Sequence, residues 1–508
     1  MLSFTLNDRL TLILSNYNIS LLLPLAAILL FSIYVAATAV YNLYFHPLAS
    51  FPGPFWARCS LLWRLFNSLS GKLHLAIERE HKKHGSVFRV SPNELSFASV
   101  SSWKDIYGHP TGGRPTMVKS EFYDLYGAGF KSLCVGSERD PHRHGQMRKS
   151  LSSAFSTKSL SEQEHIVNQV VDKFIDRIGE VGEKEGSKGV NVTKWYEMVS
   201  FDILGEMAFG ESFHCVQNGK PHFWSELVLD HLYFITLADN LHRFPIIPYI
   251  VRTLFPSTLV VQNRNSKYSR EIVAKRLATK SSRKDFLTTL VSKYESGEME
   301  KEELTAHSST LVIAGGETTT TFLSSVNFYL LKNPGAYRRL TREIRERFAR
   351  YEDINSTAAQ QLPYLQAVIN EGLRIYPPGS QGFPRVSPGA TIDGHYIPRG
   401  VEVYTSAWTV THDEANFKDA MAFRPERWLD PESTDIKEAS QPFSLGPRGC
   451  LGRNFAYMQI NLLLAKILWT YDLELTNPET DWEGESLMYV MWWKPAAMVR
   501  FSPRSLSA

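Results

Sequence analysis

The apolar residues of this chain recur mostly with helical spacing. Residues 162–178, 304–331 and 362–375 carry them at intervals of three and four, which predicts helices. Short β-branched and aromatic runs that predict strands occur at residues 87–90, 390–396 and 401–404. We therefore expect residues 49–508 to form one domain that is mainly α with small β-sheets. Such a domain is larger than usual, so we expect something central to organise it.

The amino-terminal segment, residues 1–48, follows a different pattern because it is almost free of charge. Between Arg9 and Arg58 there is no Asp, Glu, Lys or Arg, and residues 21–41 are apolar apart from small or weakly polar positions. About 20 such residues cross the ~30 Å hydrocarbon core, so we predict one transmembrane helix at residues 20–42. A cleaved signal peptide is the alternative, but the apolar part of a signal peptide has only about 7–15 residues.

The charges on either side of this span predict its orientation. Arg58, Arg64 and Lys72 follow it, whereas only Asp8 and Arg9 precede it. Because basic residues stay on the cytosolic side of a membrane, we expect the bulk of the chain to lie in the cytosol.

Composition excludes several other classes of protein. With 508 residues, of which 43% are hydrophobic and 21% are charged, the chain is neither disordered nor a small disulfide scaffold. The 55 basic and 52 acidic residues leave a net charge of +3 without a concentrated basic tract, so we expect no nucleic-acid partner. The four cysteines are too few and too far apart for a disulfide framework, which favours a reducing compartment.

Cys450 differs from the other cysteines in its surroundings. The sequence from Phe443 to Arg453 is FSLGPRGCLGR, and an apolar stretch that predicts a helix follows at residues 455–468. Glycines allow close backbone approach, and the start of a helix favours a negative charge, so this loop is expected to stabilise a thiolate. One such thiolate suits a haem iron, whereas an ordinary buried cysteine is the alternative.

The loop resembles the Phe-x-x-Gly-x-Arg-x-Cys-x-Gly ligand loop of the cytochrome P450 family. The matching positions are Phe443, Gly446, Arg448, Cys450 and Gly452. The stretch YFHPLASFPGP resembles membrane-anchored fungal members in particular. The resemblance implies a mainly helical fold around haem b, an iron ligated by the thiolate of Cys450, and insertion of one oxygen atom from O₂ into an organic substrate.

A second motif, AGGETT, begins at Ala314 within the predicted helix of residues 304–331. Two glycines inside a helix cost about 1 kcal/mol each, so tertiary structure must require them. The motif resembles the family's distal helix, where small residues such as Ala314 and Gly315 border the haem and leave room for O₂. The resemblance makes Glu317 the acid and Thr318 the alcohol that deliver protons to oxygen.

Two further groups of charged residues fit the same family. Glu371 and Arg374 are spaced i, i+3, and the resemblance joins them to Arg427 in a buried structural cluster, although a surface ion pair is the ordinary interpretation of that spacing. The cationic positions that the resemblance assigns to the haem propionates are His144, Arg148, Arg385 and Arg448. His142 and His144 could also suggest a metal pair, but no further ligands accompany them.

The sequence leaves the substrate open beyond its chemical class. Segments expected to line the pocket are mostly apolar and favour a lipophilic ligand. These segments are residues 111–130, 223–249, 311–318, 378–383 and 487–491. The fungal resemblance suggests secondary metabolism.

No flavin domain is evident, so we expect NADPH to supply electrons through a separate NADPH–cytochrome P450 reductase, with cytochrome b5 as a further partner, at the endoplasmic reticulum membrane. Two alternatives stay open: a haem-thiolate isomerase or dehydratase, and a haem sensor or electron carrier. An electron carrier has no use for the Glu317–Thr318 pair, and isomerases of this family often lose the distal Thr.

Overall fold

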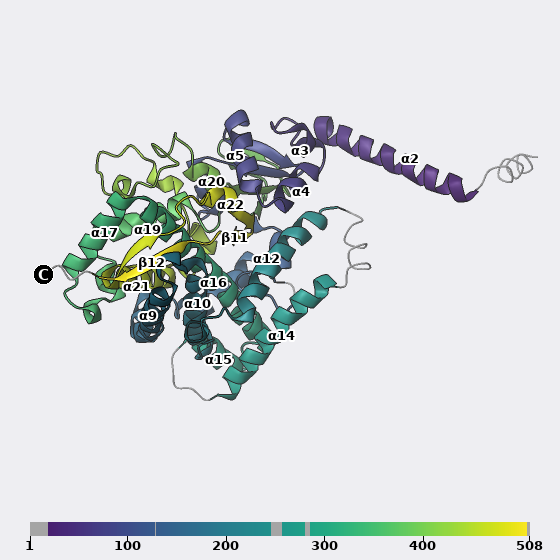
Figure 1. Ribbon diagram of the computed structural model, residues 1–508. Helices are drawn as coiled ribbons and strands as arrows, with labels where there is room; N and C mark the ends of the chain where they lie inside the picture. The colour runs from purple at the N-terminus through teal and green to yellow at the C-terminus, as the bar shows by residue number, and fades with distance from the viewer. Residues whose placement is uncertain (1–18, 128, 245–256, 280–284, 505–508) are drawn as a thin grey trace, which may run out of the picture.

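Helices make up most of the computed structural model, which describes residues 19–127, 129–244, 257–279 and 285–504 (Figure 1). The α-helices are α2 (Ile19–Val40), α3 (Phe55–Cys59), α4 (Leu62–Leu69), α5 (Leu73–His84), α6 (Val100–Tyr107), α7 (Phe122–Tyr126), α8 (Pro141–Ser152), α9 (Thr157–Glu185), α10 (Val192–Leu204), α11 (Cys215–Asn218), α12 (Phe223–Leu241), α14 (Ser257–Ala278), α15 (Thr288–Glu295), α16 (Lys301–Lys332), α17 (Pro334–Arg347), α18 (Ser356–Ala359), α19 (Pro363–Ile375), α20 (Ala407–Thr411), α21 (Arg453–Thr470) and α22 (Trp482–Glu485). The three predicted helices are confirmed as α9, α16 and α19.

The strands are short and pair mostly over long sequence distances. They are β1 (Val87–Ser91), β2 (Glu94–Phe97), β3 (Val118–Lys119), β4 (Val190–Asn191), β5 (Arg385–Val386), β6 (Ala390–Ile392), β7 (His395–Ile397), β8 (Glu402–Thr405), β9 (Tyr471–Leu475), β10 (Leu487–Tyr489), β11 (Met491–Trp493) and β12 (Met498–Pro503). The largest sheet has the order β1-β2-β8-β5-β3, and its one parallel pair sets Leu95 opposite Val403. The predicted strands are confirmed as β1, β6, β7 and β8. The pairing itself could not be predicted from local patterns.

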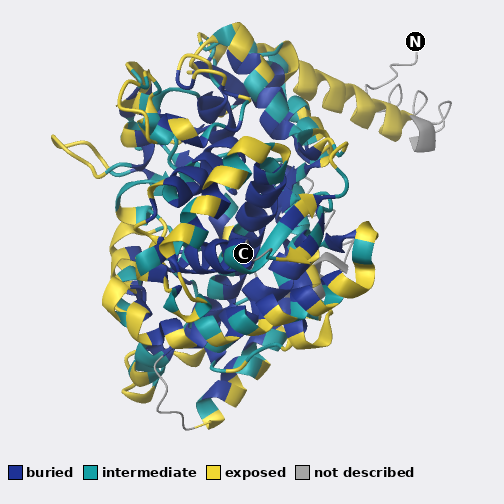
Figure 2. Cartoon of the chain, turned by 60° about the vertical axis from the view of Figure 1, so that its left-hand side comes forward, coloured by how far each residue is buried: buried dark blue, intermediate teal, exposed yellow. Residues whose placement is uncertain are grey.

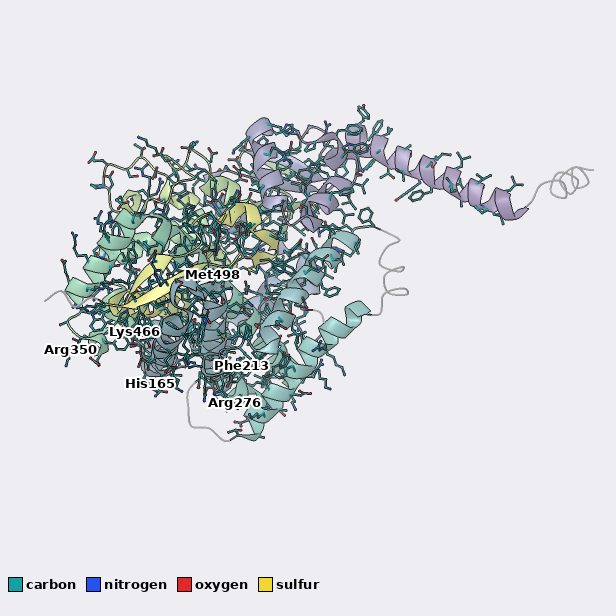
Figure 3. All side chains as sticks on the ribbon, in the orientation of Figure 1. His165, Phe213, Arg276, Arg350, Lys466 and Met498 are labelled. Carbon is teal, nitrogen blue, oxygen red and sulfur yellow. The ribbon has the colours of Figure 1, made fainter. Side chains whose placement is uncertain are left out.

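Helix α16 runs through the largest apolar cluster and packs against α10, α14, α19 and α21. On the outer side of this cluster, α9 lies along α21, where the Lys466 ammonium donates to the Asp172 carboxylate at 2.6 Å (Figure 3). A second apolar cluster lies under the five-stranded sheet and includes Leu48, Leu95 and Val403. The fold is therefore a helical body around α16 with the sheet beside it.

The amino-terminal helix α2 projects from this body and is exposed along the length for which exposure is described (Figure 2). Its 22 residues span about 33 Å, enough for the ~30 Å apolar core of a bilayer. Within the described residues, the segment Leu22–Phe45 is the one helix apolar enough for this role, with a mean hydropathy of 2.2. The Ser32 hydroxyl donates to the Ile28 carbonyl at 2.8 Å, so this polar group is satisfied within the helix.

The contacts of residues 41–48 belong to the body, although the sequence predicted a boundary at residue 49. Leu48 is fully buried in the second cluster. The Asn42 side chain donates to the Cys59 carbonyl at 3.1 Å, and the Asn42 carbonyl accepts from the buried Arg89 guanidinium at 2.7 Å. We therefore propose that the folded domain begins after Val40.

Two truncations test this boundary and the predicted anchor together. Removing residues 1–40 should release the protein from membranes and leave its stability unchanged. Removing residues 1–44 should lower the free energy of unfolding by about 1–3 kcal/mol, because the Arg89 guanidinium loses the Asn42 carbonyl. Membrane sedimentation and thermal unfolding measure the two effects. Equal stability of both truncated proteins would contradict the boundary, and persistent membrane binding would show a second attachment.

Candidate functional site

The Cys450 loop is fixed by its own backbone and by α6. The Cys450 N–H donates to the Phe443 carbonyl at 2.8 Å, which closes the loop. Gly446 has φ +66°, and a Cβ there would lie 2.2 Å from the Tyr107 carbonyl at the end of α6. Only glycine fits at this point, so the motif's first glycine is explained by a close approach.

The Cys450 side chain is exposed, unlike those of Cys59, Cys134 and Cys215. The surrounding protein is nevertheless dense enough that burial raises the pKa of the Cys450 thiol, while the Gly452 N–H and the charges of Arg148 and Arg453 act less strongly in the opposite direction. The expectation that the loop alone favours a thiolate is therefore wrong in its net direction. Coordination to a metal deprotonates a thiol outright, so the loop would still serve an iron ligand.

Several cations gather beside this loop. Arg148 on α8 donates to the Gly449 carbonyl at 2.6 Å, and Arg448 donates to the Arg139 carbonyl at 2.6 Å. Arg385 on β5 donates to the Tyr123 hydroxyl at 2.7 Å, and Lys119 on β3 donates to the Gly136 carbonyl at 2.6 Å. Within the part of the chain that the structure describes, none of the four cations Lys119, Arg148, Arg385 and Arg448 forms a salt bridge.

Mutual repulsion is evident in the pKa values of this cluster. Burial and then the charges of Lys119, Arg448, Arg148 and Arg385 lower the pKa of His144 to about 3. Burial, and after it the charge of Arg385, lowers the pKa of Arg448 to about 10. Burial, and after it the charges of Arg448 and Arg385, lowers the pKa of Lys119 well below its usual range. A dianion placed here would relieve the repulsion, so the donor set fits the two propionates of haem.

The sequence analysis missed two members of this cluster, Lys119 and Tyr123. Lys119 is 4% exposed, and its ammonium lies over the Tyr123 ring at 4.8 Å. Neither residue stands in a motif, because the strand β3 that carries Lys119 has two residues and no periodicity. Burial is the property that marks Lys119 as unusual, and burial of this residue cannot be read from the sequence.

Helix α16 presents its motif on two faces. Ala314 is exposed and Thr318 is partly exposed, one turn apart, although the helix is otherwise largely buried. The Thr318 hydroxyl donates to the Ala314 carbonyl at 2.8 Å. Ala314 and Thr318 therefore form the open face of the helix.

The two glycines lie on another face, which differs from the expectation that Gly315 leaves room for O₂. A Cβ on Gly315 would lie 2.8 Å from Leu204, and one on Gly316 would lie 2.9 Å from Phe201, both on α10. The missing side chains therefore allow α10 to pack closely against α16. This tertiary requirement is what outweighs the poor helix propensity of glycine.

Glu317 is buried and has a partner that the sequence analysis missed. Its Oε1 forms an ion pair with Lys494 Nζ, which comes directly after β11. The two side chains are 4% and 5% exposed. The predicted distal acid is thus held by a lysine 177 residues away in the sequence.

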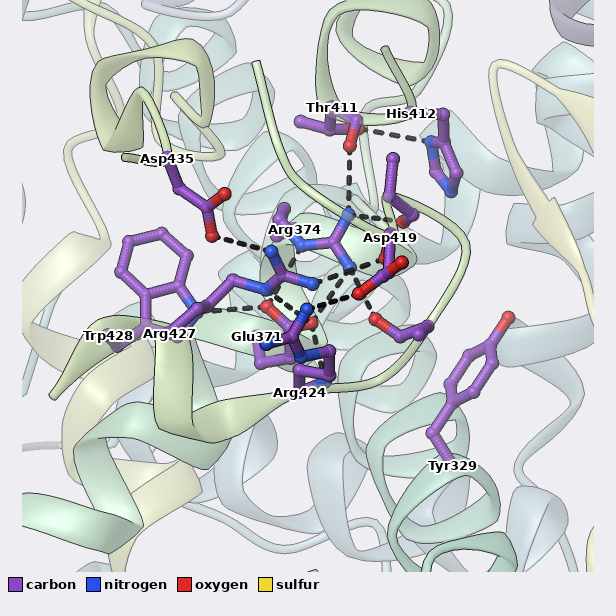
Figure 4. Close-up of polar contacts among 12 residues, drawn as sticks. Tyr329, Glu371, Arg374, Thr411, His412, Asp419, Arg424, Arg427, Trp428 and Asp435 are labelled. Carbon is purple, nitrogen blue, oxygen red and sulfur yellow. Dashed lines mark hydrogen bonds and ion pairs between the residues drawn. The ribbon is translucent and has the colours of Figure 1, made fainter. Parts of the chain in front are cut away.

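The predicted cluster around Glu371 is buried and fully bonded (Figure 4). Arg374 Nε and Nη2 donate to the two carboxylate oxygens of Glu371 at 2.9 and 2.8 Å, and Arg427 Nε donates at 3.2 Å. The Trp428 indole also donates to Glu371, at 2.9 Å, and Asp435 pairs with Arg427 at 2.5 Å. Glu371, Arg374 and Arg427 form a buried ion network, which excludes the interpretation as a surface pair.

A cavity lies where several of the predicted lining segments meet. Phe122, Thr236, Phe383 and Val490 contribute to it from four of these segments. Its wall is more polar than the sequence suggested, since the remaining lining residues include Arg64, Asp239 and Glu402. Residue 128 and residues 245–249 of the predicted lining lie outside the described residues.

An accessible cysteine beside a cluster of cations, and a buried helix with one open face, are features that suit a haem-thiolate protein. Comparison with known proteins agrees: the model of the family described as cytochrome P450 matches residues 50–500. The chain belongs to the cytochrome P450 family, and its enzyme class is that of the P450 monooxygenases.

Similar proteins come from fungi. "Cytochrome P450 monooxygenase ORF9" of Penicillium roqueforti (strain FM164) is 62% identical over 92% of this chain and 92% of its own length. "Cytochrome P450 monooxygenase BOT4" of Botryotinia fuckeliana is 56% identical over 91% of this chain and 88% of its own. "Cytochrome P450 monooxygenase ORF11" of P. roqueforti is 42% identical over 86% and 91%.

Replacing Cys450 by alanine tests the ligand assignment. The reduced, CO-bound protein should show the spectrum of a thiolate-ligated haem, and Cys450→Ala should lose both this spectrum and all oxidation activity. The same replacement at Cys59, Cys134 or Cys215 should leave the spectrum in place, because none of these side chains is exposed. Loss of the spectrum in one of these controls but not in Cys450→Ala would contradict the assignment.

Replacing Trp428 by phenylalanine tests the network around Glu371. The indole N–H bond to a buried carboxylate would be lost while the ring stays, so the free energy of unfolding should fall by about 1.5–3 kcal/mol. Chemical denaturation measures this change. An unchanged stability would show that the indole bond contributes nothing to the network.

Proposed function

We propose that the chain binds haem b between the Cys450 loop and the open face of α16, and that it oxidises a lipophilic molecule with O₂. Cys450 would ligate the iron, and Lys119, His144, Arg148, Arg385 and Arg448 would bind the propionates. The unpaired cations beside an exposed cysteine are the observation that carries this proposal. The bound group supplies the activation of O₂.

The chain's own residues would control protons on the open face of α16. The Thr318 hydroxyl uses its proton for the Ala314 carbonyl, so its oxygen remains free to accept a hydrogen bond from water. A water held there could pass a proton to the distal side of the site. Ala314, with only a methyl group, would keep the neighbouring space open.

The substrate class follows from the lining and from the fungal relatives. Phe122, Phe383 and Val490 offer apolar surface for a lipophilic molecule, beside the polar wall to which Arg64, Asp239 and Glu402 contribute. The similar proteins come from fungi and are named monooxygenases. We place this chain in fungal secondary metabolism on that basis.

Electrons would come from NADPH through NADPH–cytochrome P450 reductase, with cytochrome b5 as a further partner. Arg143 and Lys149 on α8 and Arg453 at the start of α21 are exposed on the elements that border Cys450. This basic surface suits an acidic electron donor. With α2 in the endoplasmic reticulum membrane and the domain in the cytosol, donor and acceptor would share one membrane.

The replacement Thr318→Ala tests the proposed reaction. Haem and substrate should still bind, because the change affects neither Cys450 nor the cations. Product formed per NADPH consumed should fall by a factor at the low end of the ~10²–10⁴ that acid–base assistance contributes, and peroxide release should rise. The measurement is product, peroxide and NADPH in membranes that contain the reductase.

Thr320→Ala is the matched control. Its hydroxyl makes the same bond one turn back, to the Gly316 carbonyl at 2.9 Å, but it is buried toward Tyr196 of α10. Coupling should stay near the wild-type value in this variant. Unchanged coupling in Thr318→Ala and in Glu317→Ala would contradict the proton relay, and product formed without NADPH would indicate a haem-thiolate isomerase instead.

A further inference from the structure

The side chain of Lys494 is buried, and its described polar contacts go to α16 or to Trp492 of β11. Its ammonium pairs with Glu317 Oε1 and donates to Thr321 Oγ1 at 3.2 Å and to the Trp492 carbonyl at 3.1 Å. An ammonium has three donors, so these contacts account for all of them. Lys494 is therefore fixed in one position although its side chain is long and flexible.

Glu317 and Thr321 are one turn apart and share a face of α16, and they lie about 100° and about 60° around the helix from Thr318. By bridging them, Lys494 fixes the orientation of the Glu317 side chain, which is attached to the residue directly before Thr318. The backbone between Glu317 and Thr318 is part of a continuous helix, so their Cβ atoms keep a fixed separation.

A second carboxyl group faces this pair from α10. Burial raises the pKa of Glu197, and the negative charges of Glu317 and Glu226 raise it further. A hydrogen bond from Ser225 of α12 and the positive charge of Lys494 act in the opposite direction and lower it. Glu197 is only partly buried, and the charges of Glu317 and Lys494 both act on it. Three titratable groups from α10, α16 and the β11 strand end thus meet beside the open face of α16.

Buried ion pairs seldom stabilise a fold more than apolar residues of the same size would, so stability alone does not explain this pair. Its place beside Thr318 points to the reaction. We propose that Lys494 is a positioning residue for the oxidation reaction: its ammonium holds the Glu317 carboxylate in one place beside Thr318, so that Glu317 can take up a proton from solvent and donate it to the water on Thr318. The inference rests on the proposed function.

The first test reads the charge of Glu317 without using activity. In Lys494→Met, a buried carboxylate is left without an opposite charge and should take up a proton at pH 7. Infrared spectra should show a new carbonyl stretch of a neutral carboxyl group, absent from the wild type and from the double variant Lys494→Met/Glu317→Gln. No new band in Lys494→Met, or a band that persists in the double variant and so belongs to another group such as Glu197, would overturn the inference.

The second test follows electrons in the full-length protein with its reductase and no added substrate. One NADPH and one proton reduce O₂ to hydrogen peroxide, whereas two NADPH and two protons reduce it to two waters. Proton delivery favours water, so the wild type should consume more than one NADPH per peroxide released. Lys494→Met should lower this ratio toward one, and Lys494→Arg, which keeps the charge, should restore it.

Lys466→Met is the matched control, because Lys466 is also a buried lysine bonded to a carboxylate, that of Asp172, on the outer side of the helical body. It should keep the wild-type ratio even where stability falls.

If Lys494→Met does not bind haem, Thr321→Val removes one acceptor of the ammonium and should give an intermediate ratio. If Lys494→Met or Thr321→Val has a normal CO spectrum and the wild-type ratio of NADPH consumed to peroxide released, the role of Lys494 is overturned but the proposed function is not. A wild-type protein without that spectrum or without NADPH-dependent O₂ reduction would overturn the proposed function itself.

Discussion

The close crossing of α10 over α16 determines where chemistry can take place in this protein. Gly315 and Gly316 remove the two side chains that would collide with Leu204 and Phe201, so α10 packs closely on that face of α16. α14, α19 and α21 pack on other parts of the same helix. What remains is a short open face at Ala314 and Thr318, in the middle of an otherwise largely buried helix. The position of the site is thus a consequence of packing rather than of a separate pocket-forming element.

Charge is used in two opposite ways on the two sides of this packing. The arginines around Glu371 have their donors satisfied by carboxylates and carbonyls, so they hold α19 against residues 411–435 and leave nothing for a ligand. The cations around Lys119 and Arg448 are bonded to carbonyls and a hydroxyl, and among the described residues they form no salt bridge with a carboxylate. An arginine–carboxylate network is complete in itself, whereas a cluster of cations is stable only when an anion joins it.

A third set of charges links the edge of the site to the amino-terminal part of the domain. Arg64 on α4 bonds Glu94 of β2 at 2.8 Å and Asp239 of α12 at 2.5 Å, and Arg243 bonds Glu402 of β8 at 2.8 Å. Burial acts to raise the pKa of Asp239, but Arg64 and Arg243 hold it at about 2. These pairs connect the end of α12 to the five-stranded sheet and to α4.

The sequence by itself determined the features that depend on neighbouring residues. The periodicity of α9, α16 and α19, the apolar length of α2, the Cys450 loop and the spacing of Glu371 and Arg374 are local, so they could be identified without a structure. Tertiary structure decided the rest: the role of Gly315 and Gly316, the contact of Asn42 with Arg89, the pairing of Glu317 with Lys494, the place of Lys119 and Tyr123 in the cation cluster, and the raised pKa of the Cys450 thiol. Each of these depends on burial or charge between residues that are distant in the sequence, and no local pattern carries that information because packing alone brings the residues together.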